Sequence, residues 1–299
     1  APTGRAFVLV GPDADALAEV LTAIGAVVRR VPAGSTTPSA DATFDATTGD
    51  AAAIQPPVPA RVTVGERIDF ARRHMPVVSA SADRLAASRL LSGRRVGVCL
   101  ALEPKTAVLV LELARAGAEV SAYGHPEETD VAVAAELRAQ GITVFADPDP
   151  ARADELADAF LAQRLHLLVD DGSHLIRRLL DHPQWAGDLV GAAEETTSGL
   201  RPLRGRQLPF PVVAVNDAGS KLCFDNAHGT GQSCLFTVLD LVAPDGAWPL
   251  AGRTVVVAGF GPVGEGFARH AAALGARVGV ADPDPVAALR AQFAGHETG

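Results

Sequence analysis

The chain has 299 residues, of which 48% are hydrophobic and 20% are charged, so it is long enough for two domains and is not a disordered protein. Its formal net charge is −9 and it has no basic runs, which argues against nucleic acid or an anionic membrane surface as a partner. Three cysteines without C-x-x-C spacing, no stretch like a signal peptide and no apolar run of about 20 residues predict a cytoplasmic protein with no disulfide framework, no metal site and no membrane span.

The first 60 residues have the pattern of a β-α-β unit followed by a linker. Apolar runs at residues 6–10 and 26–31 predict strands, and Asp13 predicts the start of a helix that continues to Ile24. Residues 32–40 have the composition of a loop, and three prolines within residues 55–59 predict a linker. We therefore predict an N-terminal extension over residues 1–60.

Residues 61–228 alternate between strand and helix patterns. The predicted helices cover residues 67–74 and two later stretches that end at Ala116 and Ala139. The predicted strands are residues 95–100, 118–122, 143–145, 165–169 and 189–192. This alternation predicts a parallel sheet covered on both faces, and we interpret it as a substrate domain.

Residues 229–299 have the pattern of a Rossmann domain. A helix is predicted at residues 233–241, strands at 254–258 and 277–281, and a helix between them that ends at Leu274. The fold class is therefore α/β, a parallel-sheet substrate domain followed by a Rossmann-type NAD-binding domain. Because a Rossmann sheet normally has five or six strands and only two are predicted here, we expect this domain to be incomplete at its C-terminus.

A dinucleotide motif connects these last two strands. Gly259, Gly261 and Gly264 form G-x-G-x-x-G directly after a buried strand and before a helix, the context in which backbone N–H groups bind a pyrophosphate. Asp282 ends the second strand and can accept hydrogen bonds from both ribose hydroxyls, which favours NAD over NADP. A glycine-tight turn without a ligand is the alternative.

Lysine is rare in this chain. Of 26 basic residues only Lys105 and Lys221 are lysines, and lysine can lose its proton when desolvated whereas arginine effectively cannot. A lysine whose pKa is lowered by burial would suit proton abstraction from a hydroxyl group. Lys221 and Asp225 are placed i and i+4, so they can share a helical face, although a structural salt bridge would have the same spacing.

Several short motifs in the same order resemble the S-adenosyl-L-homocysteine hydrolase family, with this chain as a divergent member. Residues 191–200, GAAEETTSGL, are similar to the family's G-x-x-E-E-T-T-T-G, and residues 215–226, VNDAGSKLCFDN, to its V-N-D-x-x-x-K-x-x-F-D-N. Asp-Asp-Gly at 170–172 and the nucleotide-binding turn at 259–285 also match. The resemblance covers about residues 65–299.

The resemblance implies roles for individual residues. Asp171, Glu195, Lys221 and Asp225 match positions that hold a nucleoside ribose and perform its acid–base chemistry, and Asn216 matches an active-site asparagine. The implied NAD contacts are Thr196, Thr197, Ser198, Asn226, Gly261, Val263, Gly264 and Asp282. The implied reaction oxidises the 3′ carbon with NAD, removes the now acidic 4′ proton and expels the 5′ substituent by β-elimination.

The chain departs from the family pattern in one segment above all. The family has H-M-T-x-x-T where this chain has Ala101, Leu102, Glu103, Pro104, Lys105 and Thr106. In the family this segment borders the base and the 5′ side of the substrate, so we expect Glu103 and Lys105 to bind substrate. The family's cysteine beside the nicotinamide corresponds to Thr230, and the loop at residues 121–130 is shorter and lacks the family's motif.

These changes predict that redox-assisted elimination is kept while the substrate differs. Our leading hypothesis is a nucleoside dehydratase of nucleoside antibiotic metabolism, which expels water from the 5′ carbon. The alternatives are an S-adenosylhomocysteine hydrolase, a non-catalytic NAD- or nucleoside-binding homologue, and a dehydrogenase that releases NADH. By resemblance alone we expect a homo-oligomer, a dimer or a tetramer.

Four isolated histidines are further candidates for metal binding or acid–base chemistry. His74, His125, His174 and His228 have no metal-ligand spacing. An isolated histidine is more often a surface residue or a packing residue than a functional one. His228, however, lies beside the predicted hinge and could act as an acid or base.

Overall fold

The computed structural model describes residues 6–10, 27–31, 42–45, 54–55, 62–242 and 249–299. Its contacts divide the chain into two units, Ala1–Arg67 and Ile68–Gly299. Each unit is described by itself.

The first unit contains a small sheet with the order β2-β1-β3-β4. Its strands are β1 (Ala6–Val10), β2 (Val27–Val31), β3 (Ala42–Asp45) and β4 (Ile54–Gln55). The two strands predicted from the sequence are confirmed and pair in parallel, whereas β3 and β4 were not predicted. Gln55, predicted as the start of a linker, lies in β4. The predicted helix at 13–24, the loop at 32–40 and residues 56–59 lie outside the described residues.

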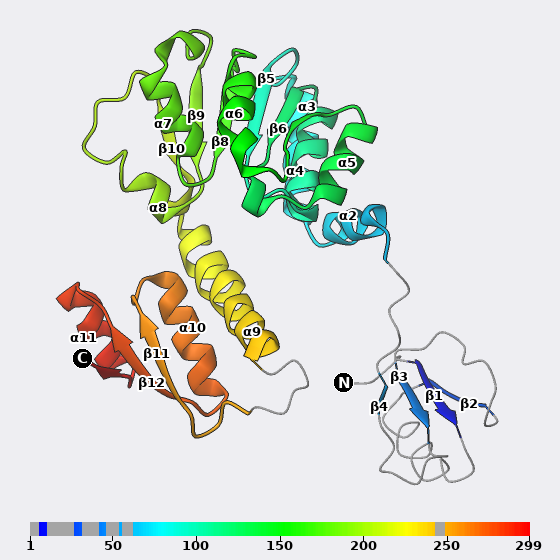
Figure 1. Cartoon of the computed structure of the whole chain (residues 1–299), viewed down its shortest axis with the longest axis vertical. Helices are drawn as coiled ribbons and strands as arrows, with labels where there is room; N and C mark the ends of the chain where they lie inside the picture. Colours follow the sequence, from blue (N-terminus) through cyan, green and yellow to red (C-terminus); the bar gives the residue numbers. More distant parts are fainter. Residues whose placement is uncertain (1–5, 11–26, 32–41, 46–53, 56–61, 243–248) are drawn as a thin grey trace. The chain divides into compact units, whose positions relative to one another are not determined.

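The second unit contains a parallel sheet of six strands with the order β10-β9-β8-β5-β6-β7 (Figure 1). The strands are β5 (Arg95–Cys99), β6 (Glu119–Tyr123), β7 (Thr143–Phe145), β8 (Leu167–Asp170), β9 (Gly191–Glu194) and β10 (Val212–Ala214). The parallel sheet predicted from the sequence is confirmed. The strand predicted at 189–192 begins two residues later, at Gly191, and β10 was not predicted.

The helices of this region are α2 (Val64–Arg73), α3 (Pro76–Ser88), α4 (Pro104–Arg115), α5 (Val131–Ala139), α6 (Ala153–Leu161), α7 (His174–Asp181) and α8 (Thr197–Leu200). Short 3-10 turns are η1 (Pro126–Glu128), η2 (Pro150–Arg152), η3 (Pro183–Trp185) and η4 (Val215–Asp217). Val98, Phe160, Leu168 and Ile176 are almost completely buried in the core around the central strands. β5 is buried on both faces, which is why it is rich in apolar residues.

The strand order reverses between β5 and β8. The chain builds β5, β6 and β7 outward in one direction and then returns to β8 on the other side of β5. In open parallel sheets, ligands bind beyond the carboxyl ends of the strands at such a switch point. The topology therefore predicts a ligand site at the residues that follow Cys99 and Asp170.

The C-terminal region begins with a long helical segment. It comprises the π-helical η5 (Lys221–Thr230), which continues into α9 (Gly231–Val242). The elements that follow are β11 (Thr254–Ala258), α10 (Pro262–Ala273), β12 (Arg277–Ala281), α11 (Pro285–Phe293) and β13 (Glu297–Thr298). The described sheet has the parallel order β11-β12-β13, so the sequence prediction of two strands was one short.

Two glycines bring this helical segment close to α10. A Cβ on Gly266 would lie 1.9 Å from the carbonyl oxygen of Ala227, and a Cβ on Gly231 would lie 2.8 Å from the backbone nitrogen of Phe267. Only glycine permits this approach of two backbones. The segment that carries Lys221 is thereby packed directly on the first helix after the dinucleotide motif.

Candidate active site

Asp170, the first aspartate of the Asp-Asp-Gly motif, has a structural role. Asp170 ends β8 and is completely buried, and its Oδ2 accepts hydrogen bonds from the backbone nitrogens of Leu175 (3.0 Å) and Ile176 (2.7 Å). It thereby holds the start of α7. Burial is the main reason why the pKa of Asp170 is raised to about 7.

Glu194, the first glutamate of the Glu-Glu pair, also has a structural role. Glu194 is fully buried, and its Oε1 accepts from the backbone nitrogens of Gly172 (3.0 Å) and Thr196 (2.8 Å). Its Oε2 accepts from the backbone nitrogen of Ser173 at 2.7 Å. Glu194 therefore ties the turn after β8 to the end of β9, and this fixes the positions of Asp171 and Glu195 at the carboxyl edge.

Lys221 is the centre of a polar cluster. Its Nζ lies 2.8 Å from Oε1 of Glu195 and 3.2 Å from Oδ2 of Asp225, and it donates a hydrogen bond of 2.7 Å to Oδ1 of Asn226. The buried Asn226 in turn donates to Oδ1 of the buried Asn216 at 3.3 Å. The structure thus brings five residues named from the sequence into one network, in which Lys221 and Asp225 lie on one face of the helical segment, as their spacing allows.

The protonation state of Lys221 differs from the sequence expectation. Burial alone would lower the pKa of this amine, but hydrogen bonds and attraction from Glu195 and Asp225 outweigh that effect and raise the pKa above its ordinary value. The expectation of a pKa lowered by burial was wrong, because two carboxylates accompany the lysine. The two carboxylates therefore favour the ammonium form of Lys221.

The pKa of Asp171 is shifted toward neutral pH. It follows β8 and is half-buried. Burial, then repulsion from Glu195 and Glu128, raises its pKa to about 6. A carboxylate with this pKa is mostly ionised at neutral pH and still holds a proton more strongly than an ordinary aspartate does.

Glu103 and Lys105 line the same pocket as Asp171 and Glu195. The pocket has a volume of about 640 Å³ including its open mouth, and its apolar wall is formed by Met75, Val78, Leu100 and Leu109. Nζ of Lys105 lies 2.9 Å from Oε1 of Glu103 at the exposed rim. The residues predicted to bind substrate therefore lie beside two of the residues predicted to act on it.

Thr196, Thr197 and Ser198 lie at the start of α8. The hydroxyl of Thr196 caps this helix by accepting from the backbone nitrogen of Gly199 at 3.1 Å, and it donates to Glu194 at 2.7 Å. It is therefore engaged within the fold, whereas Thr197 and Ser198 are exposed. Contacts of these three residues with NAD stay a prediction.

The dinucleotide motif forms a tight turn at the N-terminus of α10. Gly259 has φ of +95°, and a Cβ on Gly264 would lie 2.0 Å from the carbonyl oxygen of Gly259, so both positions require glycine. A Cβ on Gly261 would meet no protein atom within 4 Å. It would project into open space beside the first N–H groups of the helix, where a pyrophosphate would bind.

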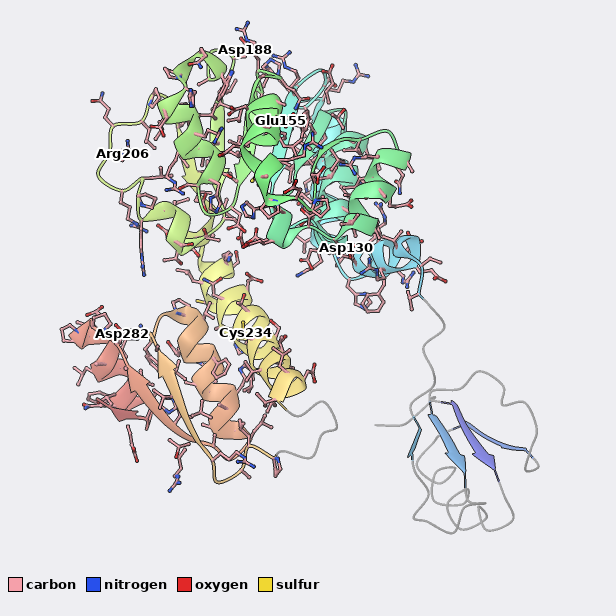
Figure 2. The ribbon with its side chains drawn as sticks, in the orientation of Figure 1. Asp130, Glu155, Asp188, Arg206, Cys234 and Asp282 are labelled. Carbon is pink, nitrogen blue, oxygen red and sulfur yellow. The ribbon has the colours of Figure 1, made fainter. Side chains whose placement is uncertain are left out.

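Asp282 lies beside this turn at the end of β12 (Figure 2). Its Oδ2 accepts from the backbone nitrogen of Phe260 at 2.5 Å and its Oδ1 accepts from that of Asp284 at 2.8 Å. These two bonds lower its pKa and leave lone pairs on both oxygens for ribose hydroxyls. Together with the half-buried Val263 in the first turn of α10, the turn fits an NAD ribose and pyrophosphate.

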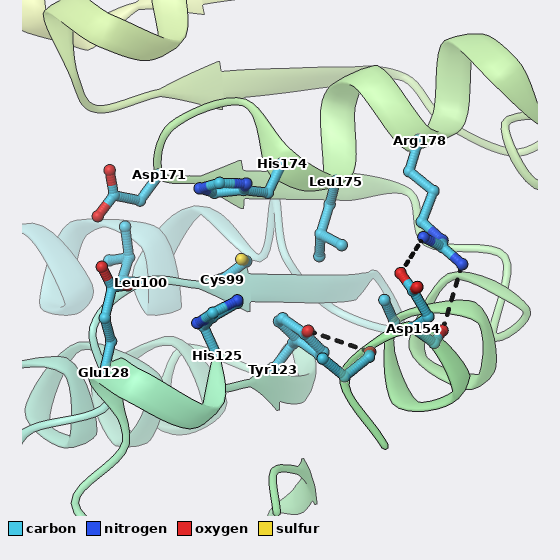
Figure 3. Close-up of a pocket in the computed structure, with 12 residues that line it drawn as sticks. Cys99, Leu100, Tyr123, His125, Glu128, Asp154, Asp171, His174, Leu175 and Arg178 are labelled. Atoms are coloured by element: carbon cyan, nitrogen blue, oxygen red, sulfur yellow. Dashed lines mark hydrogen bonds and ion pairs between the residues drawn. The ribbon is translucent and has the colours of Figure 1, made fainter. Parts of the chain in front are cut away.

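Two histidines that the sequence did not assign meet in a second cavity (Figure 3). His125 and His174 line a space of about 620 Å³ that also contacts Leu100 and Asp171. Their rings are stacked with centroids 6.1 Å apart. Spacing along the chain could not identify them, but both follow strands next to the switch point, and that position was the available signal. His228 lies elsewhere, with its ring 6.0 Å from that of His270.

Comparison with protein families matches residues 232–298 to the S-adenosyl-L-homocysteine hydrolase NAD binding domain. The chain is 42% identical over 238 residues to an S-inosyl-L-homocysteine hydrolase of Methanopyrus kandleri, a match that covers 77% of this chain and 55% of the relative. Adenosylhomocysteinases of Halobacterium salinarum (38%, covering 82% and 58%) and Thermotoga maritima (39%, covering 75% and 57%) are also similar.

The chain belongs to the S-adenosyl-L-homocysteine hydrolase family. The family resemblance inferred from the motifs is thus confirmed, and so is the NAD-binding domain. The chain spans little more than half the length of the curated relatives that it matches. In this member of the family, the Lys221 cluster and the glycine turn at residues 259–264 are both within the described residues.

Two further observations concern the part of the chain whose side chains are described, residues 62–242 and 249–299. Within it, no three His, Cys, Asp or Glu side chains are grouped as the ligands of a metal ion would be. None of the described helices is both long enough and apolar enough to cross a membrane.

Proposed function

We propose that this chain provides the nucleoside site and part of the NAD site of an enzyme that cleaves the thioether of an S-nucleosyl-homocysteine. The observation that carries the proposal is Lys221, held by Glu195, Asp225 and Asn226, next to a pocket that contains Asp171. The relatives named above as S-inosyl- and S-adenosyl-homocysteine hydrolases support this substrate class. The division into a substrate domain at residues 61–228 and an NAD-binding domain at residues 229–299 is part of the proposal.

In this proposal the lysine cluster binds the ribose diol. The ammonium of Lys221 donates to a hydroxyl oxygen while Glu195 and Asp225 accept from the hydroxyl groups. In its ammonium form, Lys221 can take the 3′-hydroxyl proton only after it passes one of its own protons to Glu195 or Asp225. NAD, when bound, accepts a hydride from the 3′ carbon and later returns it.

Asp171 provides the second proton transfer. Once the 3′ carbon is a ketone, the 4′ proton is acidic, and the carboxylate of Asp171 takes it. The electron pair of the C4′–H bond forms the C4′–C5′ double bond while the C5′–S bond breaks and homocysteine leaves as a thiolate. Addition of water to the same double bond, with the proton transfers reversed, completes hydrolysis.

Glu103 and Lys105 are placed to bind the purine. Glu103 can only accept hydrogen bonds when ionised and Lys105 can only donate them. The six-membered ring of adenine offers a donor on N6 and an acceptor on N1, and that of hypoxanthine offers an acceptor on O6 and a donor on N1. The pair therefore suits either base, and both must be tested.

A nucleoside dehydratase is the second candidate. It is favoured by the altered segment at residues 101–105, which borders the base and the 5′ substituent by resemblance. Oxidation at the 3′ carbon and proton removal at the 4′ carbon are common to both candidates. The leaving group differs, and only the hydrolase then adds water to the double bond. A role in nucleoside antibiotic metabolism belongs to this second candidate alone. The homo-oligomeric state and the cytoplasmic location remain predictions.

The test is a product analysis with the full-length protein and NAD. S-adenosylhomocysteine, S-inosylhomocysteine and the free nucleosides are incubated separately, while free thiol, absorbance at 340 nm and product mass are followed. Release of homocysteine from either thioether supports the hydrolase. Loss of one water from a free nucleoside supports the dehydratase, accumulation of NADH with each turnover indicates a simple dehydrogenase, and no reaction with any of them favours a binding homologue.

A further inference from the structure

The cavity that contains His125 and His174 adjoins the pocket that contains Glu103 and Lys105. Leu100 and Asp171 line both spaces, so Asp171 lies where the two meet. Figure 3 shows the His174 ring next to Asp171 and facing the His125 ring across the cavity. The Asp171 side chain therefore borders both the purine pocket and the space that contains the two histidine rings.

Local structure holds His174 against the turn that carries Asp171. His174 begins α7. Gly172 has φ of +68°, which lets the chain fold back sharply between Asp171 and His174. A Cβ on Gly172 would lie only 2.7 Å from Nε2 of His174, so the imidazole covers this glycine. His125 follows β6 and precedes η1, and its ring stacks on that of His174 at an interplanar angle of 26°.

The other titratable groups in this cavity are unsuited to carry a proton near neutral pH. Burial raises the pKa of Cys99 on β5 well above its ordinary value and raises that of Tyr123 on β6 to about 12. Asp154 on α6 is 2.7 Å from Nη1 of Arg178 on α7, so these two charges are paired. Glu128 on η1 is exposed and adds negative charge near Asp171. Imidazole is the side chain whose ordinary titration lies between pH 5 and 8.

We infer that His174, positioned by His125, relays protons between Asp171 and the solvent during the proposed reaction. The inference deepens the proposed function and rests on it. Asp171 takes the 4′ proton as the C5′–S bond breaks, and His174 accepts that proton from Asp171. The exposed ring then gives it to water or to the leaving thiolate, so Asp171 and His174 both return to their starting forms. His174 acts on the 4′ proton only through Asp171.

The test compares His174→Ala with His182→Ala in the full-length protein with NAD. His182 lies at the other end of α7, packs against Trp185 and does not line the cavity, so it is a matched control. Two signals are recorded with the thioether that the wild type cleaves: reduction of NAD at 340 nm, which precedes proton transfer at Asp171, and release of homocysteine. Each variant is measured across pH 5–9 with and without added imidazole.

We expect His174→Ala to lower the rate of homocysteine release about 10- to 100-fold while NAD reduction stays close to wild type. Added imidazole should restore part of the lost rate in His174→Ala but not in a double variant that also carries Asp171→Asn. His125→Ala should show a smaller loss in the same step, and His182→Ala no change. Homocysteine release by His174→Ala at the wild-type rate and with the wild-type pH profile would overturn the relay alone. A wild-type protein that neither reduces NAD nor releases thiol would overturn the proposed function and the relay with it.

Discussion

Nζ of Lys221 lies 2.8 Å from Oε1 of Glu195, and this ion pair joins the π-helical η5 to the end of β9. The lysine side chain is 16% exposed, so the pair is shielded from water more than an ordinary surface salt bridge. It places a cation with several titratable partners beside the pocket that contains Asp171.

Lys221→Arg tests whether this cation must give up a proton. Arginine can replace the charge but effectively cannot be deprotonated, so we expect NAD reduction by a nucleoside to fall by about 100-fold or more while nucleoside still binds. Stopped-flow absorbance at 340 nm measures the first effect and calorimetry the second. Arg269→Lys, at an exposed ion pair on α10, is the control and should behave as wild type. Unchanged NAD reduction in Lys221→Arg would remove the lysine from proton transfer.

The pKa of Asp171 predicts the acidic limb of the pH–rate profile. Asp171 must be ionised to take the 4′ proton, and its pKa is about 6, so kcat/KM should rise with pH and level off above this value. Glu128 contributes to the raised pKa. Glu128→Gln should therefore move the limb to lower pH, whereas Glu127→Gln, on the same turn, should leave it unchanged. A limb that stays in place in Glu128→Gln would mean that another group controls it.

Asp170 predicts how stability depends on pH. Its pKa is raised from 3.8 to about 7 in the fold, so between these values the folded chain holds a proton that the unfolded chain has lost. The free energy of unfolding should therefore fall as the pH rises from about 4 to 7. Asp170→Asn keeps an oxygen for the nitrogens of Leu175 and Ile176 and cannot ionise. Its melting temperature should decline less over this range than that of the wild type, and an equal decline would contradict the assignment.

Substitution of Gly261 should weaken NAD binding, whereas substitution of Gly264 should weaken the fold of the NAD turn. Gly264→Ala would place a methyl group against the carbonyl of Gly259, so we expect a lower melting temperature even without NAD. Gly261→Ala meets no protein atom and should melt as the wild type does in the absence of NAD. It should nevertheless bind NAD at least about tenfold more weakly, because the methyl group occupies the space where the pyrophosphate approaches. Normal NAD affinity in Gly261→Ala would argue against this position for the cofactor.

Ser173 stores strain beside the site. It is completely buried, has φ of +49°, and its hydroxyl has no hydrogen-bond partner among the described residues. Ser173→Gly relieves the left-handed strain and removes the unpaired hydroxyl, and we expect it to raise the free energy of unfolding by about 1 kcal/mol. Ser233→Gly, within α9, should have the opposite sign. Urea denaturation measures both, and destabilisation by Ser173→Gly would contradict the strain.

Most of the described strands and the dinucleotide turn could be predicted from the sequence because their signals are local, whereas β3, β4, β10 and β13 were not predicted. The apolar runs at β5, β7, β11 and β12 and the glycine spacing at 259–264 each fix structure within a few residues. The Lys221 cluster was reached through motif resemblance, since Glu195 and Asn216 are far from Lys221 along the chain. The raised pKa of Lys221 could not be predicted, because it depends on both carboxylates being within 3.2 Å of its amine. The cavity with His125 and His174 depends on the strand order, which brings the ends of β6 and β8 to either side of β5.

In the proposed reaction, the protein removes the 4′ proton of a nucleoside after oxidising the 3′ carbon. The most direct measurement is incubation of the full-length protein and NAD with adenosine or inosine in D₂O, followed by mass spectrometry and NMR of the recovered nucleoside. We expect one deuterium per nucleoside, located at the 4′ carbon, and none with Asp171→Asn. Reduction of NAD without any deuterium at the 4′ carbon would contradict the claim and would indicate a simple dehydrogenase.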